Sequence, residues 1–167
     1  ERAAPGTSVR SGWLDRTLGL RGTGTAFQAV QLGSGLPASA FLGPSPELAM
    51  WSVDSFDLSG SGDAADRARW RNALTALHTG APVAIGAPAA TALSALATAN
   101  QLQEDGYVPD PAANYPDTSL GNALMDVARV VKAGVGLQVA AVDYGDWDMH
   151  VDLGNPDSGW LFDKLDE

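Results

Sequence analysis

The spacing of apolar residues along the chain predicts helices that alternate with short strands. In the clearest segment the apolar residues recur every three or four positions, at Leu120, Ala123, Leu124, Val127, Ala128 and Val131. This period places them on one face of an α-helix. Asp117 or Thr118 can cap its first turn. The helix is expected to end at Ala133, because the following Gly134 favours the backbone conformation that terminates helices.

The same period predicts two more long helices. Residues 63–79 begin with a capping Asp63 and are followed by Gly80, and their expected buried stripe is Trp70, Leu74 and Leu77. A further helix is expected to open at Pro88, since proline suits the first helical position, and to run to about Glu104. Its expected buried side chains are Leu93, Leu96 and Ala97. Shorter helices are predicted at residues 12–18 and 160–165.

Three strands are predicted between these helices. Residues 27–32 alternate apolar and polar side chains, and residues 48–53 form a second short apolar segment. Residues 137–143 are almost continuously apolar, which is typical of a parallel strand covered on both faces. Residues 36–42, between the first two strands, are expected to form a short helical turn. A helix, a tight turn and a buried strand in succession indicate an α/β fold with a mostly parallel sheet.

Composition narrows the class of protein. The chain has 167 residues, of which 45% are hydrophobic, so residues 1–167 are expected to form a single domain with a core. Ten basic and twenty acidic residues give a formal net charge of -10, which argues against nucleic acid and anionic membrane surfaces as partners. We find no stretch of about 18 apolar residues and therefore predict no membrane span. The lack of cysteine excludes disulfides and thiolate ligands.

The two ends of the sequence suggest a piece of a longer protein. The chain opens at Glu1 without an initiating methionine, and residues 160–165 resemble a helix that is cut short. We therefore expect a middle fragment, whose partners include the remaining segments of the same protein.

Candidate chemistry concentrates after the third predicted strand, where ligands gather in open α/β sheets. Residues 143–152 contain four aspartates and one of the two histidines. Asp148, His150 and Asp152 are spaced by two, so they would share a face of an extended segment. A carboxylate and an imidazole on one face can bind Zn²⁺ or a similar ion. The alternatives are a helix cap, a surface salt bridge or a solvated acidic segment.

The number of available ligands limits this hypothesis. A catalytic zinc site needs about three protein ligands, and the other histidine, His78, is expected to interact with the end of its own helix. The remaining ligands would be Asp146, Asp143, Asp152 or residues outside this sequence. Phosphate-binding loops, dinucleotide-binding glycine motifs and nucleophile elbows are all missing from the sequence. The catalytic residues are therefore left unassigned.

Several segments, taken in order, resemble a known group of proteins. They are Gly12-Trp13-Leu14-Asp15-Arg16, Ala29-Val30-Gln31-Leu32-Gly33 with Leu36-Pro37, Leu120-Gly121-Asn122-Ala123-Leu124 with Ala128-Arg129 and Ala133-Gly134, and Gly145-Asp146-Trp147-Asp148-Met149-His150. Their order and spacing resemble the bacterial proteins of domain-of-unknown-function family 1501, which are related to the alkaline phosphatase and sulfatase superfamily. The last segment is the most specific, because that family usually has Gly-Gly-Trp-Asp-Thr-His there. Asp148 and His150 match this pattern, whereas Asp146 and Met149 depart from it.

The resemblance implies part of an alkaline-phosphatase-like α/β/α sandwich with a mostly parallel central sheet. It implies export, so that the protein would be secreted or periplasmic. It also implies a divalent metal ion (Zn²⁺, Ca²⁺ or Mn²⁺) bound by Asp148 and His150. Asp146 is a second-rank ligand, because the family does not have an acidic residue at that position.

The activity implied by the resemblance is metal-dependent hydrolysis of a small-molecule phosphate or sulfate ester. The family has further Ser-His and Asp-His segments that these 167 residues lack, so the isolated chain is expected to be inactive. The alternative is a non-catalytic secreted binding or assembly module on the same fold, with a structural metal site or none.

Overall fold

A computed structural model describes residues 11–20, 22, 24–58, 62–145, 147–148, 150–151 and 153–166. The elements in chain order are α1 (Trp13–Gly19), η1 (Ala26–Gln28), β1 (Ala29–Leu32), β2 (Leu48–Met50), α2 (Ala64–His78), α3 (Val83–Asp105), η2 (Pro111–Ala113), α4 (Ser119–Lys132), β3 (Val139–Val142) and α5 (Trp160–Asp166). The described part of the chain is thus an α/β arrangement, as predicted.

The three strands form a small parallel sheet in the order β2-β1-β3. Val30 of β1 is paired with Leu48 of β2 and with Ala140 of β3, which fixes the register. The central strand β1 is buried along its whole length. The predicted parallel sheet is therefore confirmed for these three strands.

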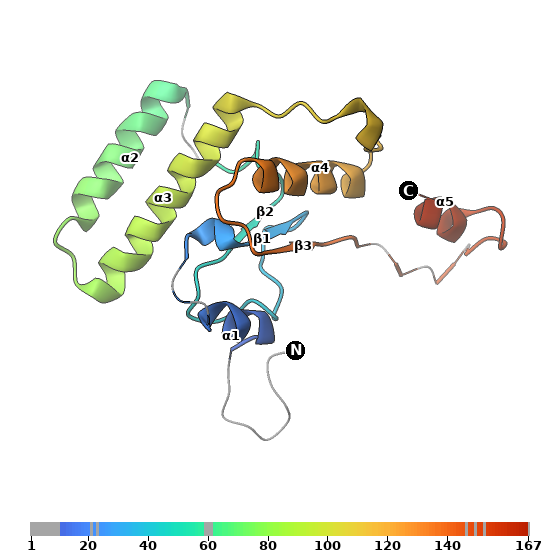
Figure 1. The fold of residues 1–167 in the computed structure, drawn as a ribbon, viewed down its shortest axis with the longest axis horizontal. Coiled ribbons are helices and arrows are strands. Elements are labelled where there is room, and N and C mark those ends of the chain that lie inside the picture. Colours follow the sequence, from blue (N-terminus) through green and yellow to red (C-terminus); the bar gives the residue numbers. More distant parts are fainter. Residues whose placement is uncertain are drawn as a thin grey trace, which may run out of the picture.

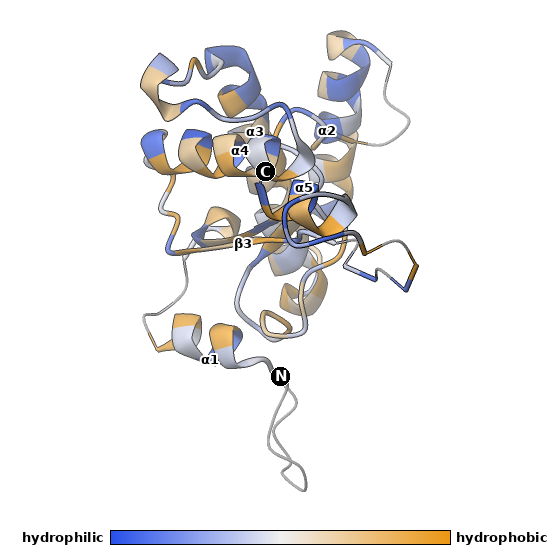
Figure 2. Ribbon diagram, turned by 90° about the vertical axis from the view of Figure 1, so that its right-hand side faces the viewer, coloured by the Kyte–Doolittle hydropathy of each residue, from blue (hydrophilic) through white to orange (hydrophobic). Residues whose placement is uncertain are grey.

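Helices cover both faces of the sheet (Figure 1). Alternate residues of a strand point to opposite faces, so Val30 packs with Ala99 of α3 and Val130 of α4 in the main core cluster. On the other face, Ala29 packs in a smaller cluster with Leu18 of α1 and Phe41. In Figure 2 the hydrophobic strand β3 runs between α4 and α1. The core therefore has two parts, separated by the sheet.

Side-chain caps begin two of the long helices where the sequence predicted them. The Asp63 carboxylate accepts a hydrogen bond from the Asp66 N–H at 2.9 Å, and the Thr118 hydroxyl accepts one from the Gly121 N–H at 3.1 Å. Each cap satisfies a first-turn N–H that has no partner within its helix. Of the two caps proposed for α4, the structure therefore uses Thr118.

The start of α3 differs from the prediction. The helix begins at Val83, with Pro82 as its N-cap at a φ of -51°, and Pro88 lies inside it. Proline removes one hydrogen bond at an interior position. The helix nevertheless continues through this position, and its C-terminal half buries Leu96, Ala99 and Leu102. Ala97, which was expected to be buried, is exposed.

The predicted buried stripe of α2 is wrong. None of the described residues of α2 is buried, and Trp70 and Leu77 are exposed to 53% and 73%. The helix packs against α3 rather than against the sheet. In Figure 1 the pair α2–α3 forms a hairpin beside the sheet. A helix in this position buries too little surface to enclose its apolar residues.

Two smaller expectations also fail. Residues 36–42 form turns rather than a helical turn, with the Phe41 N–H donating to the Ala38 carbonyl at 2.9 Å. β3 is only partly buried, because it lies at the edge of the three-stranded sheet.

Among the described residues, α3 is long and apolar enough to cross a bilayer by length and composition alone. Its C-terminal half, however, contributes to the main core cluster.

Candidate functional site

A cleft of about 550 Å³ lies at the carboxyl edge of the sheet. Parallel strands end at the same edge, so the residues that follow them meet there. Gly33 follows β1, Ser52 follows β2 and Asp143 follows β3, and all three line the cleft. The N-terminal half of α4 supplies Ser119, Asn122, Ala123 and Asp126, and α5 supplies Lys164. The fold therefore brings polar groups from five elements to one place.

Gly33 allows the ends of β1 and β3 to approach closely. Its φ is +79°, and a Cβ atom there would lie 2.8 Å from the carbonyl oxygen of Asp143. The Asp143 N–H donates to the Leu32 carbonyl at 3.0 Å, which continues the backbone hydrogen bonding between β1 and β3 by one residue. A side chain at position 33 would push Asp143 away from the cleft, so glycine is required here.

Asp126 is the buried carboxylate of the cleft. Its exposed fraction is 7%, and its Oδ2 accepts a hydrogen bond from the Val53 N–H at 2.9 Å. Burial raises the pKa of Asp126 above its ordinary value, although the Val53 N–H and the Arg129 guanidinium act to lower it. A carboxyl group with a raised pKa can hold a proton closer to neutral pH than an exposed aspartate.

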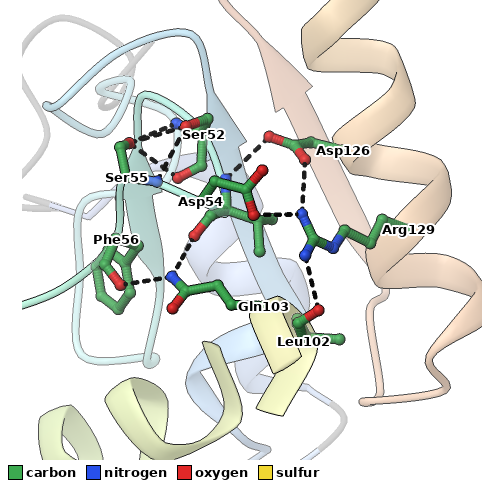
Figure 3. Close-up of polar contacts among 9 residues, drawn as sticks. Ser52, Asp54, Ser55, Phe56, Leu102, Gln103, Asp126 and Arg129 are labelled. Atoms are coloured by element: carbon green, nitrogen blue, oxygen red, sulfur yellow. Dashed lines mark hydrogen bonds and ion pairs between the residues drawn. The ribbon is translucent and has the colours of Figure 1, made fainter. Parts of the chain in front are cut away.

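Arg129 ties the segment after β2 to both α3 and α4 (Figure 3). Its Nη1 donates to the Asp54 carboxylate at 2.8 Å, and its Nη2 donates to the Leu102 carbonyl at 2.7 Å. Asp126 Oδ1 is 3.8 Å from the same Nη1. Gln103 adds a further connection, because its Nε2 donates to the Val53 carbonyl at 2.8 Å. These polar contacts, made by a buried arginine and by Gln103, hold α4 against the segment after β2 and against the end of α3.

Lys164 attaches α5 to the loop that follows β3. Its Nζ is 4.1 Å from the centroid of the Tyr144 ring and 5.4 Å from that of Trp147. The two rings meet edge to face at 5.4 Å, and the Tyr144 hydroxyl donates to the Lys164 carbonyl at 3.1 Å. Cation–π contacts of this kind favour a fixed position of the ammonium group. Lys164 thereby places a positive charge beside the acidic residues of the cleft.

Asp148 and His150 face each other in the segment beyond Trp147. Asp148 Oδ1 is 2.6 Å from His150 Nε2, and the two side chains are 78% and 82% exposed. The spacing of two residues does bring these side chains together. Asp146 and Asp152 lie outside the described residues, and Asp143 lines the cleft.

The structure shows no third ligand beside this pair among the residues that it describes. Among the described residues, no three His, Cys, Asp or Glu side chains form a group that could hold a metal ion. His78 lies in the last turn of α2, where its Nδ1 is 2.8 Å from the Leu74 carbonyl oxygen. This is a local contact at the end of its own helix.

Sequence reasoning missed Asp126, Arg129 and Lys164. One signal was available: Asp126 follows Ala123 by three positions and precedes Val130 by four, which places it on the face of α4 that packs on the sheet. The predicted stripe is correct in part: Ala123 is buried and Val127 packs against the core, whereas Leu124 and Val131 are 43% and 58% exposed. For Lys164, no pattern in the sequence links α5 to Tyr144.

The fold and the cleft define a parallel α/β protein with a polar site at the carboxyl edge of its sheet. No protein-family model, curated protein or solved structure matches this chain.

Proposed function

We propose that this chain carries part of the active site of an exported, metal-dependent hydrolase that acts on phosphate or sulfate esters. A divalent ion (Zn²⁺, Ca²⁺ or Mn²⁺) is bound by Asp148 and His150, with Asp146 as a further ligand. The observation that carries the proposal is the contact of 2.6 Å between Asp148 Oδ1 and His150 Nε2. The two ligand atoms contact each other directly, so they are near enough to share an ion once they separate slightly.

The geometry of this pair is close to what a metal ion needs. Two ligands of a tetrahedral zinc ion, each about 2.0–2.1 Å from the metal, lie roughly 3.3 Å apart. The donor atoms of Asp148 and His150 would therefore separate by less than about 1 Å to admit the ion. Both side chains are mainly exposed, so this movement meets little resistance from packing. An oxygen and an imidazole nitrogen suit zinc or manganese.

In this proposal the carboxyl-edge cleft is the place for an anionic ester. Lys164 lines it and is positioned by its contacts with Tyr144 and Trp147. An ammonium group there attracts the phosphate or sulfate group of a substrate. Asp126, whose pKa is raised by burial, lines the same cleft and is placed to exchange a proton with a bound ligand.

The wider architecture is part of the same proposal. The three parallel strands would belong to a larger alkaline-phosphatase-like α/β/α sandwich, as in domain-of-unknown-function family 1501. Further segments of the same protein would then complete the metal site, because Asp148 and His150 provide two ligands where a catalytic zinc needs about three. The sequence resemblance and the parallel arrangement of the strands support this part of the proposal.

A second candidate is a non-catalytic binding or assembly module. The exposure of Asp148 and His150, at 78% and 82%, favours it, because catalytic metal sites are shielded from bulk water more often than structural surface sites. In this case the pair would hold a structural ion or none.

Metal content tests the leading proposal. The full-length protein is loaded with Zn²⁺ or Mn²⁺, freed of excess ion and analysed by elemental mass spectrometry beside His150→Ala, Asp148→Asn and His78→Ala. We expect the wild type and His78→Ala to retain the ion, whereas His150→Ala and Asp148→Asn lose it. Equal metal content in the wild type and His150→Ala would overturn the proposal.

Two further measurements separate the two candidates. Thermal unfolding is recorded with and without chelator, and turnover is measured on a panel of aryl phosphate and sulfate esters. The hydrolase predicts turnover that disappears with chelator and in His150→Ala. A melting temperature that falls with chelator, together with no turnover of any ester, would favour the binding module.

A further inference from the structure

A second cavity, of about 440 Å³, lies at the amino end of β2, away from the carboxyl edge of the sheet. Pro44, Pro46 and Leu48 line one side of it, and Ala87 and Thr91 of α3 line the other. Its volume is in the range of small-molecule sites. Among the described residues that line it, Glu47 is the one charged group.

The carboxyl group of Glu47 lacks a hydrogen-bond donor. Its Oε2 is buried and has no partner among the described residues. The surrounding residues provide few hydrogen-bond donors for Oε2. Pro44 and Pro46 have no N–H, and the Thr91 hydroxyl already donates to the Ala87 carbonyl at 3.1 Å. A buried carboxyl group without a donor is costly. A proton on the carboxyl group or a ligand in the cavity can supply the donor that Oε2 lacks.

The electrostatic environment favours a positive ligand. Burial and, to a smaller extent, the nearby carboxylate of Asp15 on α1 together raise the pKa of Glu47 to about 7. The described lining residues from α3, from the 44–48 segment and from η1 include no other titratable side chain. A cation placed in the cavity would thus meet negative charge from Glu47 and Asp15 without competition from a basic residue of the lining.

We propose that this cavity binds a small primary amine, whose ammonium group pairs with Glu47 and whose hydrocarbon part lies against the prolines and Leu48. An ammonium group brings three donors, which satisfies the carboxylate, and a short alkyl chain matches the apolar walls. Since the amine binds the ionised carboxylate, binding releases a proton from Glu47 at acidic pH. The apparent affinity therefore rises as the pH passes through about 7. This site does not depend on the proposed hydrolase function.

The test compares n-butylamine with n-butanol, titrated into the full-length protein and followed by NMR chemical shifts of backbone amides. At about pH 8 we expect butylamine to bind roughly tenfold more tightly than butanol, the factor expected for one charge-assisted hydrogen bond. The advantage shrinks at about pH 6. Shifts should concentrate at Leu48, Ala87 and Thr91. Glu47→Gln should abolish the tighter binding of butylamine relative to butanol. The matched control Glu104→Gln, at an exposed position on α3, should leave this difference in affinity unchanged.

A second variant keeps the test decisive if Glu47→Gln is poorly folded. Ala92→Leu fills the cavity from α3 and is expected to weaken both ligands at least roughly tenfold. Equal affinity for amine and alcohol at high pH would overturn the proposal, since it would indicate an apolar groove without charge recognition. Amine binding that survives Ala92→Leu unchanged would also overturn it, because the ammonium would then be bound elsewhere.

Discussion

The Asp126 carboxylate accepts a hydrogen bond from the backbone N–H of Val53, 73 residues earlier in the chain, at 2.9 Å. Val53 is fully buried, so this N–H has no access to water. The contact joins α4 to the segment that leaves β2, and both line the carboxyl-edge cleft. The shape of the cleft is therefore coupled to the packing of α4.

Replacing Asp126 tests this coupling. Asp126→Ala is expected to lower the free energy of unfolding by about 2 kcal/mol, because it leaves the Val53 N–H buried without an acceptor. Asp126→Asn should cost about half as much, since its amide oxygen still accepts from Val53 while its NH₂ group faces Arg129. Urea unfolding measures both. As a control, Asp117→Ala at an exposed position should stay within about 0.5 kcal/mol of the wild type. Equal losses in the free energy of unfolding for Asp126→Ala and Asp117→Ala would contradict a buried hydrogen bond between Asp126 and Val53.

Arg129 is expected to contribute more to the free energy of unfolding than an arginine in an exposed ion pair. Arg129→Ala removes hydrogen bonds to Asp54 and to the Leu102 carbonyl, and it leaves Asp126 without its cation. We expect a loss of about 3 kcal/mol in the free energy of unfolding. Arg69→Ala, which breaks an exposed pair with Asp66 on α2, should cost less than about 0.5 kcal/mol. Chemical denaturation at neutral pH distinguishes the two, and similar losses would argue against a buried network.

Glu47 predicts a pH dependence of stability. Its pKa is raised from 4.5 to about 7 in the folded protein, so the folded state binds the proton more tightly than the unfolded state. The free energy of unfolding should therefore fall as the pH rises from about 4.5 to 7, and the raised pKa of Asp126 acts in the same direction from a lower pH. Glu47→Gln should flatten this decline and Glu104→Gln should not. A decline of unchanged slope in Glu47→Gln would show that the carboxyl group titrates normally.

Lys164 is expected to hold α5 against the cleft. Lys164→Gln removes its cation–π contacts with Tyr144 and Trp147, a loss of about 1 kcal/mol. Amide hydrogen exchange in residues 160–166 should become about fivefold faster as a result. Lys132→Gln is the matched control, because that lysine contacts the Tyr107 ring and lies on α4. If exchange in α5 does not change in Lys164→Gln, another contact must hold the helix.

Helix starts were predicted best from the sequence where they depend on residues close together in the chain. Asp63 and Thr118 were proposed as caps, and both cap their helices, because a side-chain cap depends on residues within three positions. The start of α3 was misplaced because Pro88 was taken as a first-turn residue. The helical turn before Pro88 belongs to the α2–α3 hairpin, which forms by packing of two separate helices.

The sequence by itself determined where most of the helices and strands lie and the spacing that lets Asp148 and His150 meet, since these follow from backbone period over a few residues. The tertiary structure decided which face of α4 is buried. It also decided that Asp126 and Lys164 line the cleft, that Arg129 pairs with Asp54, and that Glu47 lies in an apolar cavity. Their partners, including Val53, Asp54 and Tyr144, come from other elements. The physical reason is that burial and charge pairing depend on distances in space, and residues far apart in the sequence set those distances only when the sheet and its helices assemble.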